Sequence, residues 1–288
     1  MKQVKLSLLR GVCQIPAYVA HEKGMFASEG IDSVLEVEPT AWMVPRKLAS
    51  GESQFAVIPW TRVAAGGDVP MLVVCGSGHE EAAVVVRSGV ELRDVARVTV
   101  PLRGGMKDLT AMALIEGLGW RDVEILRQPS GDGAIISLFG QGTDAASMVE
   151  PYATMMEMLD VGRIVRRTGD VWSGAPGCSL TTTVAQRDED PATVAAVVRG
   201  FVRATRFVAE HPAESAEIAS RYIGVDARFI ASALERNRPH PDAIRNQSAM
   251  DEILSLMVRL GYLERIPSGY ADLSFLDACC TEHAAAGG

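Results

Sequence analysis

The order of secondary structure is decided by residues 4–58, which read VKLSLLRGVCQIPAYVAHEKGMFASEGIDSVLEVEPTAWMVPRKLASGESQFAVI. Alternation of apolar and polar residues predicts half-buried strands, and apolar residues spaced three and four apart predict helices. The elements so predicted are a strand at 4–9, a helix at 17–26, a strand at 34–38, a helix at 43–49 and a strand at 55–58. This order indicates parallel strands with helices on both faces of a sheet.

The same pattern starts again in the middle of the chain. Residues 98–101 and 123–126 are predicted strands, with a predicted helix over 108–116 between them. After residue 191 the sequence is mostly amphipathic helix. The fold class is therefore α/β, with two successive α/β units.

The two units are expected to be the lobes of one fold. The segments 83–86 and 182–185 are predicted to carry the chain from one lobe to the other and back. Residues 1–86 and 185–288 would then form lobe 1, and residues 87–184 would form an inserted lobe 2, an ordinary size for a small domain. Because ligands bind at the carboxyl ends of strands in such folds, we expect a ligand cleft between the lobes.

Composition and charge exclude several classes of protein. The chain has 288 residues, 48% hydrophobic and 22% charged, which is enough apolar material for a sizeable core. Its formal net charge of −8 and scattered basic residues argue against an extended nucleic-acid interface, which needs clustered Lys and Arg. No apolar run approaches the roughly 18 residues that span a bilayer. We expect no nucleic-acid partner, no membrane insertion and a monomer.

Three segments carry a resemblance to a known family. They are PAYVAHEKGMF at 16–26 with EGI at 29–31, KLASGESQFAV at 47–57, and GTDAASMVEPY at 142–152. The chain resembles the nitrate, sulfonate and taurine-type substrate-binding proteins of ABC importers and the pyrimidine-precursor synthases of thiamin biosynthesis. The resemblance covers nearly the whole chain and implies a two-lobed, type II periplasmic-binding-protein-like fold, each lobe a mainly parallel sheet flanked by helices. Trp42 stands where the family often has Gly, and Gln54 replaces an acid.

The resemblance implies two functions. The first is binding of a small anionic or polar organic solute, sulfonate-, carboxylate- or pyrimidine-like, between the lobes for delivery to an ABC permease. The alternative is a cytoplasmic enzyme on the same fold, of the desulfinase, decarboxylase, lyase or pyrimidine-precursor synthase type, using Cys13 or His79. A desulfinase of aromatic sulfinates with this fold uses a cysteine in the loop where Cys13 lies. The location is periplasmic or at the cell envelope if a signal peptide preceded Met1, and cytoplasmic if Met1 is the native start.

Candidate ligand-binding residues follow the predicted strands. Arg103 and the two glycines after it precede a predicted helix, so they can offer a cation and backbone N–H groups to an anion. Cys13 is read as either a lining residue or a nucleophile, His79 as either a structural residue or an acid or base, and Glu150 as either a ligand contact or a cap. The predicted ligand-binding set is Cys13, Gln14, Trp42, Pro59, Trp60, Arg103, Gly104, Gly105, Met106, Glu150 and Tyr152.

The cysteines show no metal-binding pattern. Their number is odd, and they lack the CxxC spacing that is typical of zinc sites. The sequence also contains no pair of histidines at metal-ligand spacing. We therefore predict reduced thiols, no bound metal and no cofactor. The five cysteines are Cys13, Cys75, Cys178, Cys279 and Cys280.

Overall fold

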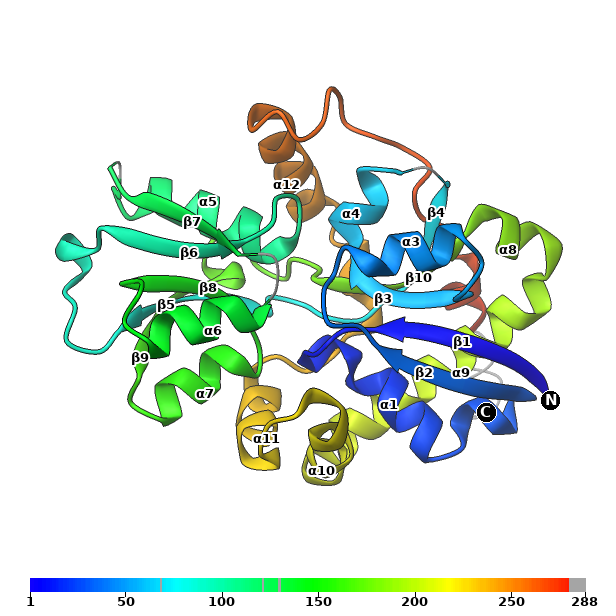
Figure 1. The fold of residues 1–288 in the computed structure, drawn as a ribbon. Coiled ribbons are helices and arrows are strands. Elements are labelled where there is room, and N and C mark those ends of the chain that lie inside the picture. Colours follow the sequence, from blue (N-terminus) through cyan, green and yellow to red (C-terminus); the bar gives the residue numbers. More distant parts are fainter. Residues whose placement is uncertain (68, 121, 129–130, 280–288) are drawn as a thin grey trace.

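The structure, a computed structural model, describes residues 1–279 except 68, 121, 129 and 130. Its described residues form two lobes, each built on a five-stranded sheet with helices packed against it (Figure 1). The α/β class and the two-lobed architecture predicted from the sequence are confirmed. No described helix has both the length and the apolar character needed to cross a bilayer.

The first lobe contains the sheet with strand order β2-β1-β3-β10-β4. β1 pairs in parallel with β2 and β3, whereas β10 runs antiparallel to β3 and β4. The strands are β1 (Lys2–Leu8), β2 (Ile31–Val37), β3 (Phe55–Pro59), β4 (Met71–Gly76) and β10 (Cys178–Thr183).

The second lobe repeats this arrangement with strand order β7-β6-β8-β5-β9. β6 pairs in parallel with β7 and β8, and β5 runs antiparallel to β8 and β9. The strands are β5 (Ala82–Arg87), β6 (Arg97–Pro101), β7 (Glu124–Gln128), β8 (Ala145–Val149) and β9 (Gly162–Arg167). Each sheet is therefore mixed, with two parallel and two antiparallel strand pairs, rather than mainly parallel as predicted. The antiparallel neighbours belong to the strand that enters from the other lobe, which is β10 in the first sheet and β5 in the second.

Helices cover both sheets and also join the lobes. α9 packs on α1 and α2, and it approaches so closely that a Cβ at Gly200 would lie 2.7 Å from the Phe26 ring. α11 contacts α7, and α12 contacts α5, so the C-terminal helices reach the second lobe (Figure 1). The helices are α1 (Ile15–Glu22), α2 (Met25–Ser28), α3 (Met43–Ala49), α4 (Trp60–Ala64), α5 (Met106–Gly117), α6 (Gly131–Phe139), α7 (Tyr152–Met158), α8 (Val184–Glu189), α9 (Pro191–Glu210), α10 (Pro212–Ile223), α11 (Ala227–Arg236) and α12 (Gln247–Arg259).

Two short connections carry the chain between the sheets. They are residues 77–81, before β5, and residues 168–177, before β10. They lie side by side, because the Gly177 amide donates to the Gly78 carbonyl at 2.7 Å and His79 bridges to Pro176. The sheet changes therefore come before the predicted segments 83–86 and 182–185. The valines of β5 and the threonines of β10 are buried and paired on both sides within one sheet each.

Candidate functional site

A cleft lies where the two sheets face each other. Its lining comes from the carboxyl ends of β1, β2 and β3 in the first lobe and of β6 and β8 in the second, together with the starts of α5 and α7. Its empty volume is about 1070 Å³, a figure that includes space open to solvent. Strand ends gather here because parallel strands of one sheet end at the same edge.

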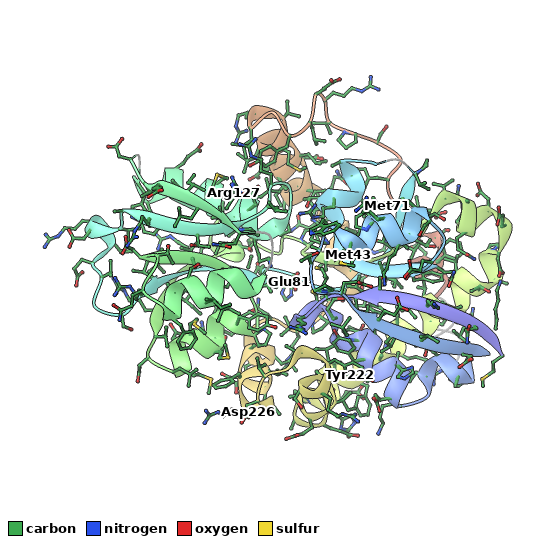
Figure 2. All side chains as sticks on the ribbon, in the orientation of Figure 1. Met43, Met71, Glu81, Arg127, Tyr222 and Asp226 are labelled. Atoms are coloured by element: carbon green, nitrogen blue, oxygen red, sulfur yellow. The ribbon has the colours of Figure 1, made fainter. Side chains whose placement is uncertain are left out.

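Three buried side chains meet at the floor of the cleft: Cys13, Glu81 and Cys178. The two sulfur atoms and a carboxylate oxygen lie within 4.8 Å of one another. The Cys178 backbone N–H donates to Oε1 of Glu81 at 3.1 Å, and the Gln14 amide donates to Sγ of Cys13 at 3.1 Å. Oε2 of Glu81 has no hydrogen-bond partner, although both thiols are close to the carboxyl group. Figure 2 shows Glu81 between the two lobes.

Two glycines make this close packing possible. A Cβ at Gly78 would lie 2.4 Å from Oε2 of Glu81 and 2.7 Å from Cβ of Cys13. A Cβ at Gly177 would lie 2.5 Å from Oε1 of the same carboxyl group. No side chain fits at those distances, so the paired connections between the lobes determine how the cluster is assembled.

Burial controls the charge at the floor of the cleft. It raises the pKa of the Cys13 thiol and of the Glu81 carboxyl group. The hydrogen bond with Cys13, followed by burial, raises the pKa of Cys178 well above its usual value. Burial therefore favours the neutral thiol of Cys13 over the thiolate, which is the nucleophilic form.

Three cationic residues line the cleft, Arg10, Arg62 and Lys107, and the last two face it from opposite lobes. Arg62 belongs to α4 and Lys107 to the start of α5, and burial lowers the pKa of both groups. The charge of Arg62 further lowers the pKa of Lys107, because two cations near each other repel. The Lys107 ammonium group makes no hydrogen bond or ion pair with the described residues, and Nε of Arg62 is buried without a partner.

Unpartnered polar atoms are concentrated in the cleft. Oγ1 of Thr40, Nε of Arg62 and Oε2 of Glu81 are three of the five buried side-chain polar atoms without a partner among the described residues. Leaving such a group unpaired costs about 1–3 kcal/mol, so most native buried groups are paired. Their concentration indicates groups reserved for a bound molecule.

The structure places part of the predicted site in the cleft. The predicted residues among its lining are Cys13, Gln14, Trp42, Pro59, Gly105, Met106 and Tyr152. The two glycines of the predicted anion-binding turn separate: Gly105 lines the cleft, whereas Gly104 faces a neighbouring surface groove with Arg103. Whether these lining residues contact a ligand stays a prediction.

Four predicted residues lie outside the cleft lining. The buried Trp60 indole donates to the Pro176 carbonyl at 2.9 Å. The exposed Arg103 guanidinium lies 5.8 Å from the centre of the Tyr262 ring, and the Gly104 backbone bonds to neighbouring side chains. These arrangements are structural contacts within the protein.

Glu150 and His79 take structural positions. Glu150 is fully buried, forms an ion pair with Arg167 and accepts the Thr154 N–H at 2.9 Å, which is the capping role weighed for it. His79 lies on a connection between the lobes, with Nδ1 3.1 Å from the Arg238 carbonyl oxygen, and is not among the cleft-lining residues.

Among the cleft-lining residues that sequence reasoning missed are the five polar residues on which the site's chemistry depends. Lys107 has a readable signal, since it lies in the segment after β6 from which Arg103 was chosen. Arg62 follows β3 by three residues, so its position near a strand end was also readable. Glu81 and Cys178 lie on the two connections, and no local pattern marks them. These five residues are Thr40, Arg62, Glu81, Lys107 and Cys178.

Similar solved structures share the whole fold. The nitrate-binding protein NrtA of Synechocystis PCC 6803 has a TM-score of 0.82 at 16% identity, over 98% of this chain and 89% of that one. The ligand-binding component of an ABC-type import system from Staphylococcus aureus, with zinc bound, has 0.81 at 15%, over 96% and 98%. The alkanesulfonate-binding protein SsuA of Xanthomonas axonopodis pv. citri, bound to MOPS, has 0.78 at 14%, over 95% and 99%.

Comparison by sequence gives a family. The predicted resemblance to nitrate and sulfonate substrate-binding proteins is confirmed at the level of fold by the structures above. No curated protein matches the sequence. The model of the NMT1-like family matches residues 1–223. Since that match spans well over half of the 288 residues, the chain belongs to the NMT1-like family.

Proposed function

We propose that the protein binds a small organic anion between its lobes and serves as the substrate-binding component of an ABC importer. The observation that carries this proposal is the pair of cations, Arg62 and Lys107, which face the cleft from opposite lobes, with Nε of Arg62 buried and without a hydrogen-bond partner. An anion between them would relieve their mutual repulsion and replace the hydration they lose on burial.

The rest of the cleft lining is apolar and aromatic, and it is complementary to an uncharged part of the ligand. Leu9, Met106 and Met148 supply apolar surface, and the aromatic rings of Trp42 and Tyr152 complete the walls. Trp42 is 43% exposed, so part of its indole is available for stacking on a planar group. A carboxylate or sulfonate attached to an apolar or planar body fits this combination better than an inorganic anion does.

The arrangement also supports binding by closure. The lobes are joined by the connections 77–81 and 168–177, and groups from both lobes line the cleft. A ligand that touches both lobes favours the closed form by its differential contacts. The nitrate- and alkanesulfonate-binding proteins of the same fold support this carrier function, and the raised pKa of the buried Cys13 thiol weighs against the enzyme alternative.

A panel of anions tests the proposal. We expect at least one of MOPS, taurine, benzoate and orotate to raise the melting temperature and to bind measurably by calorimetry, with nitrate as the inorganic comparison. Arg62→Met should weaken that binding about 10- to 100-fold, since a hydrogen bond to a charged group contributes about 1.5–3 kcal/mol. Arg103→Met, which removes a cation outside the cleft lining, is the matched control and should leave affinity within about twofold, well below that charged-bond contribution.

Two results would count against the proposal. If Arg103→Met abolishes binding and Arg62→Met does not, the anion binds at the turn predicted from the sequence. If a bound compound is chemically converted, the protein is an enzyme.

A further inference from the structure

We propose that Cys13, Glu81 and Cys178 bind a thiophilic divalent cation, for which zinc is the natural choice, at the floor of the cleft. Its three ligands are different residues from the Arg62 and Lys107 pair, and the inference goes beyond the binding of an organic anion. No local sequence pattern indicates this site, because its three residues come from three separate segments of the chain.

The donor atoms are close to the geometry that zinc requires. Zn–S bonds of about 2.3 Å and Zn–O bonds of about 2.0–2.2 Å in a tetrahedron place the donors about 3.5–3.8 Å apart. In this structure the two sulfur atoms and the carboxylate oxygen all lie within 4.8 Å of one another. A shift of about 1 Å or less would bring them to bonding distance of one ion. Because residues 78 and 177 are glycines, no side chain at these positions holds the three donor atoms apart.

The state of Glu81 points independently to a ligand. One of its oxygens accepts the Cys178 N–H, which fixes the orientation of the carboxyl group. The other, Oε2, is buried without a hydrogen-bond partner and lies beside Cys13. A cation would satisfy this oxygen, and a carboxylate held by an N–H is a common arrangement around protein-bound metals.

Charge and donor type favour zinc over hard cations. Two thiolates and one carboxylate exceed the charge of a divalent ion by one, and the nearby Lys107 ammonium balances the excess. Sulfur donors select zinc and similar ions over magnesium and calcium. The Gln14 amide, which donates to Sγ of Cys13, supplies a second layer of support for that ligand. Three protein ligands leave a fourth position open toward the cleft, since all three residues line it.

Cobalt(II) titration of the reduced, metal-free protein, without any organic anion, tests the site. We expect thiolate-to-cobalt charge-transfer absorption in the near ultraviolet and the intense visible bands of tetrahedral cobalt, saturating at one ion per chain and bleached by added zinc. Cys13→Ser and Cys178→Ser should each lose most of the charge-transfer band. Glu81→Gln, nearly the same shape, should weaken affinity at least tenfold while keeping both thiolates.

The control is Cys75→Ser. Cys75 is buried in β4, its thiol donates to the Gly76 carbonyl, and it is outside the cluster. This variant should bind cobalt as the wild type does. Circular dichroism checks that each variant is folded, and a thiol count under denaturing conditions checks that no disulfide has formed.

The proposal is overturned if folded, fully reduced wild-type protein gives no charge-transfer band. It is also overturned if the band persists in both Cys13→Ser and Cys178→Ser, since another thiol would then be the ligand. Because no organic anion is present, neither outcome bears on the anion-binding function.

Discussion

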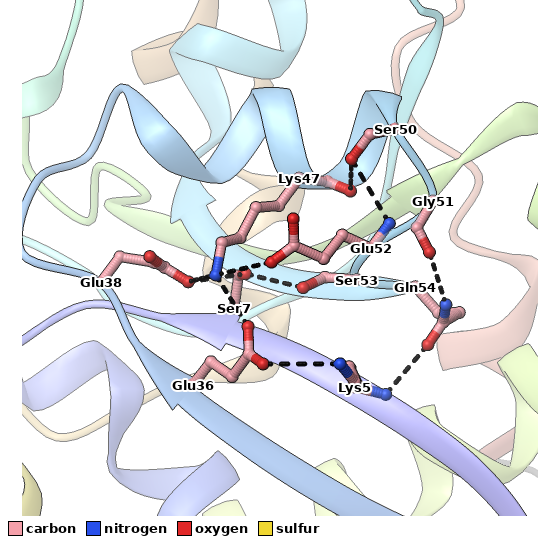
Figure 3. A network of polar contacts seen from close by, with 10 residues as sticks. All are labelled: Lys5, Ser7, Glu36, Glu38, Lys47, Ser50, Gly51, Glu52, Ser53 and Gln54. Carbon is pink, nitrogen blue, oxygen red and sulfur yellow. Dashed lines mark hydrogen bonds and ion pairs between the residues drawn. The ribbon is translucent and has the colours of Figure 1, made fainter.

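Two sets of polar side chains, one in the first lobe and one shared by both lobes across the cleft, differ in how completely they are paired. In the first, which we call the Lys47 cluster, the Lys47 ammonium group contacts Glu36 and Glu38 at 2.8 Å each and Glu52 at 3.1 Å (Figure 3). The Ser7 hydroxyl completes the cluster by donating to Glu38. Every charge in it has a partner within the protein.

The cleft presents the opposite situation. Arg62 has a buried nitrogen without a hydrogen-bond partner, and Thr40 and Glu81 each have an unpaired oxygen. Lys107 is attracted to Cys13, Glu81 and Cys178 only through space. Both clusters lie at strand ends, and both contain charged side chains. The difference indicates that pairing within the protein serves the fold, whereas polar groups left unpaired in a concave site serve a ligand.

The largest expected effect is on stability, at the fully paired Lys47 cluster. Lys47→Met should lower the free energy of unfolding by about 2–3 kcal/mol, because it leaves the buried Glu38 without its cation and Glu36 with only the more distant Lys5. Urea denaturation of wild type and variant measures this. A loss below about 0.5 kcal/mol would mean that the cluster behaves as an ordinary exposed ion pair, and the contrast with the cleft would fail.

A smaller effect, on anion affinity, is expected at the unpaired Thr40 hydroxyl of the cleft. Thr40→Val keeps the shape of the side chain and removes a hydroxyl that has no partner in the free protein, so stability should stay the same or rise slightly. Affinity for the best anion of the panel should fall about fivefold, which corresponds to the about 1 kcal/mol of one neutral hydrogen bond. Denaturation and calorimetry on the same samples separate the two quantities. Lower stability with unchanged affinity would place Thr40 with the structural residues.

Much of the fold was predictable because local periodicity reflects local structure. The strand and helix order from β1 to β3, the later strands β6 and β7, and the helices after residue 191 all follow the predicted pattern. The predicted helix over 17–26 is two helices, since Gly24 adopts φ 67° between α1 and α2. The sheet to which β5 and β10 belong was not readable, because periodicity does not record a strand's neighbours.

The site was predictable only where it follows strand ends. That rule placed Cys13, Gly105 and Met106 in the cleft. It did not distinguish Lys107, which lines the cleft, from Arg103, which lies in the same segment but contacts Tyr262 instead. Glu81 and Cys178 are 97 residues apart and meet through the paired connections between the lobes. Tertiary contacts of this kind leave no trace in local sequence.

Hydrogen–deuterium exchange with and without the best-binding anion of the panel shows whether the anion is held by both lobes. The account predicts slower exchange on binding in segments of both lobes, around residues 9–14 and 38–42 of the first and 101–107 and 148–152 of the second, because all four line the cleft. Arg62→Met should lose this protection at the same anion concentration, and Arg103→Met should keep it. Protection confined to one lobe, or to segments away from the cleft, would contradict the claim that the ligand is held between the two sheets.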